Sequence, residues 1–424
     1  VDDNSDMDVY CDPVAQANAP EGHGGSIIVR HPHGVVSVCA PWNYPVEEIV
    51  LLSIPALIAG NAIVVKPSEV VPLASGAVTQ CLIDGLNALH PGLVNLVQGD
   101  GEVGSYLVSH PGVDMCAFTG STATGAKILE AASKTLKPVV LECGGKDPMI
   151  VMEDADLERA AADAVQFSLQ NCGQVCCAVE RVYVAESVAD AFESKVKEIA
   201  STWVAGDGML EGTTIGPCVS EMQRSTVHAH VEAAIKAGAR CLLGGQMPPA
   251  SQKGTFYPPT VLAGVPHDAR AITQEETFGP VLAISSFTGG DSEAVKLAND
   301  STYGLTASVY SSDLARAGLI AEQLAAGQVG INNNPLSGAR DVRCPFVGHK
   351  RSGYGSHSGV DGWRQFSKPK SLVYSAPPPT AVLPNQAAAL TKPPRLSSPS
   401  PGLVAALLAA AAVGAIAARA IARR

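Results

Sequence analysis

Several patterns that would define a protein class at once are absent from this chain. No two Cys-x-x-Cys units occur among its 11 cysteines, which argues against a structural zinc site, and we expect no metal. The 41 glycines follow no collagen period, and no segment repeats at a fixed interval. The first residues show no signal-peptide pattern. Cysteines scattered through a chain of this length indicate a reducing compartment rather than a disulfide scaffold.

The chain also has few charges, and basic residues are the minority among them. Charged residues make up 16% of the 424 residues, with 29 Lys and Arg against 40 Asp and Glu. The formal net charge of −11 argues against nucleic acid as a partner. With 46% hydrophobic residues the composition is that of a globular protein, long enough for two to three domains.

Strand-like and helix-like patterns alternate along the chain after a polar, irregular lead-in at residues 1–25. This alternation predicts an α/β fold with mostly parallel sheets covered on both faces, in two successive α/β units. The expected strands are 26–30, 35–40, 62–66, 94–97, 115–118, 139–142, 150–152, 181–184 and 281–287. The expected helices are 47–59, 73–89, 122–133, 157–169, 188–203, 221–237, 292–299 and 314–324.

The composition changes after Tyr374. Residues 376–401 are rich in Pro and Ser and predict an extended linker, and residues 402–424 predict a C-terminal tail helix. The uncharged stretch Leu403–Ala418 would cover about 24 Å as a helix, short of the ~30 Å of a hydrocarbon core. The tail is interpreted as a membrane anchor or an interfacial helix, and the alternative is an Ala-rich helix packed on its own protein.

One candidate phosphate-binding loop lies at Phe118–Gly125, between a strand and a helix. Gly120 permits a tight turn and Ser121 is a natural N-cap, so free N–H groups of the helix could meet phosphate oxygens. The G-x-x-x-x-G spacing from Gly120 to Gly125 is neither the dinucleotide fingerprint nor a P-loop. A βα turn that simply needs glycine is an equal alternative.

Two further residues have the character of reactive groups. Cys176 lies in the Gly-containing loop Asn171–Cys177, and its thiolate would be a strong nucleophile, although most cysteines are buried small hydrophobes. Glu142 ends an apolar strand and precedes two glycines, a position suited to a general base. An ion pair with Lys146 is the alternative for Glu142.

Three loops complete the set of candidates. In Pro41-Trp42-Asn43-Tyr44-Pro45, Asn43 could cap a helix or donate its amide to an oxyanion. Lys66-Pro67-Ser68-Glu69 follows a strand and could hold ribose hydroxyls. Glu275–Pro280 contains Glu276 and Phe278, and its alternative reading is a solvated acidic turn.

Taken in order, these motifs resemble the aldehyde dehydrogenase superfamily. The matching segments are Pro-Trp-Asn-Tyr-Pro, Lys-Pro-Ser-Glu, Phe-Thr-Gly-Ser-Thr, Glu-Cys-Gly-Gly-Lys, Gly-Gln-Val-Cys, Glu-Glu-Thr-Phe-Gly-Pro, residues 299–305, Asn332 and residues 345–353. The resemblance covers residues 26–374. It implies oligomerisation strands at 26–33 and 364–375, a Rossmann-like NAD-binding domain at 34–145 and a catalytic domain at 146–363.

The resemblance also implies a reaction, oxidation of an aldehyde to a carboxylic acid with reduction of NAD. Cys176 would attack the aldehyde, Asn43 would stabilise the thiohemiacetal oxyanion, and Glu142 would activate the water that hydrolyses the thioester. The implied cofactor residues are Trp42, Lys66, Ser68, Glu69, Gly120, Ser121, Gly125, Glu276 and Phe278. A carboxylate at Glu69 favours NAD over NADP, because it would repel a 2′-phosphate.

Some features depart from the family. A lysine that many relatives use to relay protons is missing after Pro-Trp-Asn-Tyr-Pro, and a helical segment ahead of the first strand is absent, so the N-terminus is expected to be truncated. The alternatives are a CoA-acylating aldehyde dehydrogenase and a catalytically silent, membrane-tethered binding protein. We expect a homodimer or homotetramer on a membrane of unknown identity, facing the cytosol.

Overall fold

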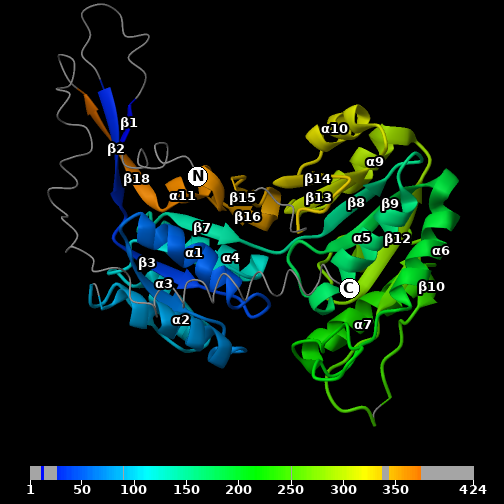
Figure 1. The fold of residues 1–424 in the computed structure, drawn as a ribbon, viewed down its shortest axis with the longest axis horizontal. Helices are drawn as coiled ribbons and strands as arrows, with labels where there is room; N and C mark the ends of the chain where they lie inside the picture. Colours follow the sequence, from blue (N-terminus) through cyan, green and yellow to red (C-terminus); the bar gives the residue numbers. More distant parts are fainter. Residues whose placement is uncertain (1–10, 14–25, 89, 250, 337–342, 374–424) are drawn as a thin grey trace, which may run out of the picture. The chain divides into compact units, whose positions relative to one another are not determined.

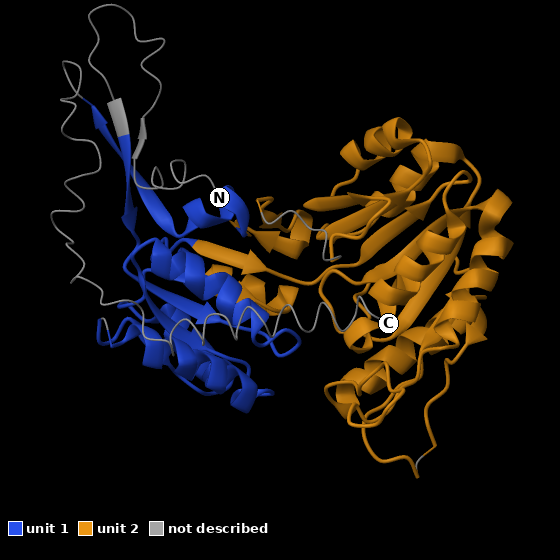
Figure 2. Ribbon diagram, in the orientation of Figure 1, with its two compact units in different colours: residues 1–117, 131–138, 357–424 blue, residues 118–130, 139–356 orange. Residues whose placement is uncertain are grey.

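The computed structural model describes residues 11–13, 26–88, 90–249, 251–336 and 343–373. These residues belong to two compact units, shown separately coloured in Figure 2. Unit 1 comprises residues 1–117, 131–138 and 357–424, and unit 2 comprises residues 118–130 and 139–356. The predicted C-terminal linker and tail helix lie outside the described residues.

Unit 1 contains a parallel sheet with helices packed against it (Figure 1). Strand β4 (Ala62–Lys66) pairs in parallel with β3 (Val35–Cys39) and with β5 (Val94–Leu96). Val36 and Val38 of β3 and Ile63 and Val65 of β4 are fully buried, as expected where helices cover a parallel sheet. The helices are α1 (Glu47–Ile58), α2 (Pro72–Leu86), α3 (Gly101–Ser109) and α11 (Gly359–Gln365).

A three-stranded antiparallel arm also belongs to unit 1. Strand β2 (Ser26–Pro32) pairs with β18 (Ser367–Val373) along its whole length, from Ser26↔Val373 to Pro32↔Ser367. Strand β1 (Cys11–Pro13) pairs with the other edge of β2, so the expectation of an irregular lead-in at residues 1–25 is wrong at these three residues. The two segments predicted as oligomerisation strands therefore pair with each other within one chain.

Unit 2 is built on a seven-stranded sheet of order β10-β11-β12-β9-β8-β13-β14. Its strands are β8 (Asp147–Val151), β9 (Val179–Ala185), β10 (Arg240–Leu243), β11 (Thr260–Ala263), β12 (Val281–Phe287), β13 (Thr306–Tyr310) and β14 (Gln328–Ile331). Only the edge strand β10 is antiparallel to its neighbour in this sheet. The prediction of an α/β fold with a second α/β unit is confirmed.

Both faces of this sheet are covered by helices, which bury alternate side chains. Met149 and Val182 belong to the core under α5 (Leu157–Leu169), α6 (Ala189–Ala200) and α7 (Glu221–Lys236). Their neighbours Ile150 and Tyr183 belong to the core under α9 (Gly290–Asn299) and α10 (Leu314–Glu322). Successive side chains of a strand point to opposite faces of the sheet, and both faces are covered, so the strands are continuous runs of apolar residues. Figure 1 shows the two helical layers of unit 2.

Shorter elements connect and extend this framework. They are β6 (Met115–Thr119), α4 (Thr122–Ser133), β7 (Val139–Glu142), η3 (Gln170–Gly173), η4 (Glu186–Val188), α8 (Arg270–Thr273), β15 (Phe346–Val347), η5 (Lys350–Ser352), β16 (Gly353–Tyr354) and β17 (Ser356–His357). Strand β16 pairs antiparallel with β7, placing Gly353 opposite Glu142.

Some predicted boundaries are wrong. The helix expected at 73–89 ends at Leu86. The Asn87 side chain that follows donates to the Val94 carbonyl and accepts the Val94 N–H, each at 2.9 Å, and so ties the chain to β5. The strand expected at 150–152 begins earlier, at Asp147, whose carboxylate accepts the N–H of Thr306. Helix α3 and strands β10, β11, β13 and β14 were not expected, since packing and not local propensity specifies them. Among the described residues, no helix combines the length and apolar character needed to cross a membrane.

Candidate active site

Glu142 stands at the end of a buried strand in unit 2. All four residues of β7 are buried, and Glu142 is only 2% exposed. Ser352 fixes the chain that follows: its carbonyl accepts the N–H of Cys143 at 2.9 Å, and its hydroxyl donates to the carbonyl of Gly144 at 2.7 Å. Glu142 is thus held on a backbone with little freedom to move.

Cys176 follows a loop with an unusual backbone. Asn171, Cys172 and Gly173 have φ angles of 52°, 60° and 66°, three successive left-handed residues. A Cβ on Gly173 would lie 2.0 Å from the carbonyl oxygen of Gly279, so only glycine fits there. The Cys176 side chain is partly buried, and its Sγ lies 3.9 Å from that of Cys177. Left-handed residues other than glycine are costly and are typical of functional sites.

Gly144 and Gly145 bring the loops of Glu142, Cys176 and Glu276 together within unit 2. A Cβ on Gly145 would lie 2.4 Å from the Cys176 carbonyl oxygen, and one on Gly144 would lie 2.3 Å from Oε2 of Glu276. The N–H of Gly145 donates to Oε1 of Glu276 at 3.1 Å. Three segments that are far apart in the sequence therefore meet at two glycines.

Burial is the main cause of the pKa shifts of Glu276 and Cys143. Burial, with the charge of Glu180 next, raises the pKa of Glu276 to about 8. Burial also raises the pKa of the Cys143 thiol to about 12, and the charges of Glu142 and Glu276 act in the same direction. Cys143 therefore stays a neutral thiol at neutral pH.

The loop at Phe118–Gly125 has the predicted cap. The Ser121 hydroxyl accepts the N–H of Thr124 at 3.2 Å, at the start of α4, and Ser121 is exposed. Gly125 is required for packing, since a Cβ there would lie 2.7 Å from Sγ of Cys143. The exposed N-terminus of α4 is compatible with a phosphate, while the glycine at 125 has a packing reason of its own.

The remaining candidates lie in unit 1, after strands β3 and β4. Trp42 and Asn43 are partly buried in the loop between β3 and α1. The Lys66 amino group donates to the Pro67 carbonyl at 2.9 Å and lies 3.6 Å from the Glu69 carboxylate, whose side chain is 55% exposed. Ser68 is buried, and its hydroxyl accepts the N–H of Val70 at 3.3 Å.

One further motif in unit 1 was not among the predicted candidates. Gly99-Asp100-Gly101-Glu102-Val103-Gly104 has the G-x-G-x-x-G spacing, follows β5 and opens α3, which is the context of a dinucleotide-binding loop. A Cβ on Gly104 would lie 3.5 Å from the side chain of Lys66, so this loop adjoins a predicted cofactor residue. The spacing itself was the signal that could have identified the loop.

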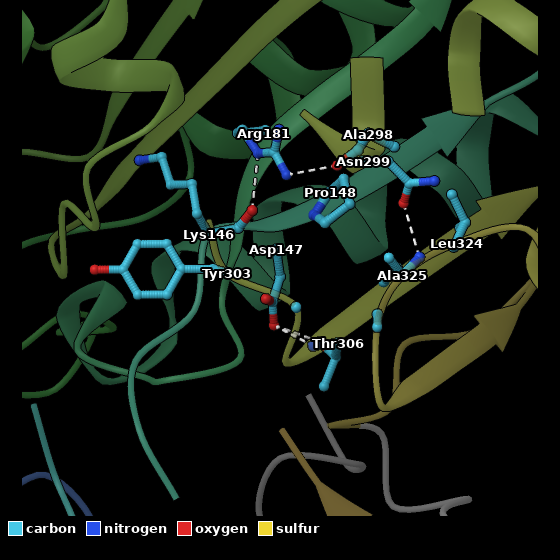
Figure 3. A pocket seen from close by; sticks show the side chains of 13 residues that line it. Lys146, Asp147, Pro148, Arg181, Ala298, Asn299, Tyr303, Thr306, Leu324 and Ala325 are labelled. Atoms are coloured by element: carbon cyan, nitrogen blue, oxygen red, sulfur yellow. Dashed lines mark hydrogen bonds between the residues drawn. The ribbon is translucent and has the colours of Figure 1, made fainter. Parts of the chain in front are cut away.

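A small hollow, open in part to solvent, lies at the start of β8 in unit 2, and Lys146, Asp147 and Arg181 are among the residues that line it (Figure 3). Arg181 donates to the carbonyls of Lys146 and Ala298 at 2.8 and 2.9 Å, and Asp147 accepts the Thr306 hydroxyl at 2.6 Å. Burial raises the pKa of Asp147 well above its usual range. These hydrogen bonds fix the start of β8, directly after Gly144, Gly145 and Lys146.

An α/β protein with a loop cysteine and a buried glutamate on meeting segments is a candidate enzyme of the covalent, cysteine-dependent class. The sequence pattern of the aldehyde dehydrogenase family matches residues 10–372. The betaine aldehyde dehydrogenase of Sinorhizobium fredii is 40% identical over 354 residues, which are 83% of this chain and 71% of the relative.

Solved structures give the same result. The betaine aldehyde dehydrogenase of Staphylococcus aureus, solved in complex with NAD+, matches with a TM-score of 0.78 at 34% identity over 86% of this chain and 72% of that one. An NADP-dependent enzyme of Escherichia coli matches with a TM-score of 0.80 at 35% identity, over 86% and 74%. This chain belongs to the aldehyde dehydrogenase family. It is an oxidoreductase that acts on aldehydes with a nicotinamide cofactor.

The contact at Gly145 generates a first prediction. In Gly145→Ala the new methyl group must displace the Cys176 carbonyl, so we expect the free energy of unfolding to fall by about 1–3 kcal/mol and kcat for aldehyde oxidation to fall about 100-fold. Urea unfolding and initial rates measure the two effects. Gly216→Ala is the control, since no atom lies within 4 Å of its Cβ. Equal kcat in the two variants would contradict the argument.

Proposed function

We propose that Cys176 is the nucleophile of a hydrolytic, NAD-dependent aldehyde dehydrogenase. The observation that carries this proposal is the contact of Gly145 with the Cys176 carbonyl and the Glu276 carboxylate, since it brings the backbone of Cys176, the chain that follows Glu142 and a candidate cofactor residue together within unit 2. The Cys176 thiolate forms a C–S bond to the aldehyde carbon, and the carbonyl oxygen becomes an oxyanion. We assign the stabilisation of that oxyanion to the side-chain amide of Asn43, on the resemblance of its Pro-Trp-Asn-Tyr-Pro motif.

NAD, when bound, would supply the acceptor for the hydride that leaves this carbon, and Cys176 would then hold the acyl group as a thioester. Glu142 takes a proton from a water molecule, whose oxygen attacks the thioester carbon. The C–S bond breaks, releasing a carboxylic acid and restoring the Cys176 thiolate. The buried position of Glu142 at a strand end next to two glycines supports this role.

The residues fit a dinucleotide in two groups. In unit 1, Trp42, Lys66, Ser68 and Glu69 follow strand ends, and we assign Lys66 and Glu69 to the adenosine ribose. In unit 2, Gly120, Ser121 and Gly125 at the start of α4 would hold the pyrophosphate, and Glu276, with Phe278 near it in sequence, would accept hydroxyls of the nicotinamide ribose. The exposed carboxylate of Glu69 favours NAD over NADP. We also propose that β2 and β18 contribute to a homodimer or homotetramer.

The active-site assignment is tested by single substitutions. We expect Cys176→Ala to lose all measurable NADH production with a panel of aldehydes. We expect Glu142→Gln to keep a burst of about one NADH per site but to lose steady turnover by about 100-fold, because it forms the thioester and hydrolyses it slowly. Stopped-flow absorbance of NADH measures both.

Product analysis separates the alternatives. A carboxylic acid whose yield is unaffected by added CoA supports the hydrolytic reaction, and an acyl-CoA product would identify the CoA-acylating alternative instead. NADH formation that persists in Cys176→Ala would remove this cysteine as the nucleophile. A wild-type chain that binds NADH but oxidises no aldehyde would identify the silent binding protein.

The pKa of Glu276 predicts a pH dependence of cofactor binding. With a pKa of about 8, Glu276 is mostly protonated at pH 7 and mostly ionised at pH 9, and the ionised form accepts both ribose hydroxyls. The dissociation constant of NADH should therefore fall about tenfold between pH 7 and pH 9. Fluorescence titration checks this, with Glu276→Gln expected to bind weakly and independently of pH. Binding that weakens with rising pH would contradict the assignment.

We further propose that residues 402–424 attach the enzyme to a membrane, with the catalytic units in a reducing compartment facing the cytosol. The support is compositional: a Pro- and Ser-rich spacer separates the folded units from an uncharged stretch with arginines at its end. The full chain should sediment with membranes after carbonate treatment, and a chain ending at residue 401 should not. Identical sedimentation of the two chains would refute the anchor.

A further inference from the structure

The loop that carries Glu276 and Phe278 needs support from outside itself. It lies between α8 and β12 in unit 2, and Phe278 has a φ of 51°, in the left-handed region that non-glycine residues rarely adopt. Such a conformation persists only where surrounding contacts over-determine it.

Glu180 supplies contacts to the backbone of this loop. It is the second residue of β9 and is 4% exposed. Its carboxylate accepts the N–H of Thr277 at 2.8 Å and the N–H of Phe278 at 2.9 Å. Two consecutive backbone donors therefore converge on one buried side chain, immediately after Glu276.

Lys146 holds both Glu180 and the loop. Its amino group, fully buried, forms an ion pair with Glu180 and donates to the Thr277 hydroxyl at 3.0 Å. The other groups that face Thr277 are His230, whose Nδ1 lies 3.2 Å from the same hydroxyl, and Gln223, which donates to the Thr277 carbonyl at 3.0 Å. Burial lowers the pKa of Lys146 and of His230.

A buried ion pair is weak evidence for stability alone, because apolar residues of similar volume often serve a fold as well. In this pair the Lys146 amino group and both Glu180 carboxylate oxygens instead contact the loop of Glu276. Gly145, which precedes Lys146, donates its N–H to Glu276 itself. We propose that Glu180 and Lys146 are positioning residues that set Glu276 and Phe278 for the nicotinamide ribose. This inference rests on the proposed function, because that function assigns Glu276 to the cofactor.

The test compares two ligands. NADH reaches the nicotinamide-ribose site, whereas ADP lacks that part of the cofactor. All assays are run at pH 9, where Glu276 is already mostly ionised in the wild type, so that loss of the Glu180 charge does not itself change NADH binding by lowering the pKa of Glu276. In Glu180→Gln we expect the dissociation constant of NADH and the KM for NAD to rise about tenfold, while ADP affinity and the KM for aldehyde change less than about twofold. Glu193→Gln is the matched control, since Glu193 is a buried glutamate of unit 2 paired with Arg240 away from this loop, and it should leave all four values unchanged.

A second variant covers the case in which Glu180→Gln fails to fold. Thr277→Val keeps the volume but removes the hydroxyl that Lys146 contacts, so NADH binding should weaken, and Thr277→Ser should restore it. Equal weakening of NADH and ADP in either variant would indicate a merely structural role and overturn the inference.

Glu276→Gln in the same assays separates this inference from the proposed function. If it leaves NADH affinity unchanged, the cofactor role of Glu276 is wrong. If it weakens NADH binding and the variants of Glu180 and Thr277 do not, only the positioning inference is wrong.

Discussion

The site in unit 2 depends on the absence of side chains at Gly144 and Gly145. A methyl group at either position would lie within 2.4 Å of an oxygen of Glu276 or Cys176, closer than real contacts allow. The backbone approaches are close because Ser352 fixes the loop from one side and β8 begins at once on the other. The loops of Cys176 and Glu276 can approach the chain that follows Glu142 only where that chain occupies so little space, and this approach supports the proposed roles of the three residues.

The positions of Glu142, Cys176 and Glu276 at the ends of strands explain why their segments meet at Gly144 and Gly145. Glu142 ends β7, whereas Cys176 and Glu276 lie in segments that lead into the parallel strands β9 and β12. Because β8, β9 and β12 are parallel, their amino ends share one edge of the sheet. Ligands usually bind at the carboxyl edge of such sheets. In unit 2 the residues proposed for catalysis instead lie at the amino edge, where the chain passes from Glu142 at the end of β7 through Gly144 and Gly145 into β8.

The sequence predicted the alternation of strands and helices and the candidate residues, because apolar periodicity and short motifs are local signals. Glu142 was singled out by its position between an apolar strand and two glycines, and Ser121 by its capping ability. Glu180 carries no such signal: inside a strand of apolar residues it reads as an exception, and its partners lie 34 and 97 residues away. Sequence spacing cannot show that a buried charge is neutralised by tertiary contacts. The G-x-G-x-x-G spacing that begins at Gly99, in contrast, is a local signal that the sequence contains.

The same carboxylate that holds the loop also governs its chemistry. Glu180 raises the pKa of Glu276 through its charge, second only to burial, while Lys146 lowers it. If Glu180 were apolar, Lys146 would face Glu276 without a counter-charge and would favour ionisation at lower pH. Burial and the charge of Glu180 thus outweigh the effect of Lys146 and keep Glu276 partly protonated near neutral pH. Burying Glu180 and Glu276 in one region is tolerable because Glu180 is paired with Lys146 and Glu276 can hold its proton.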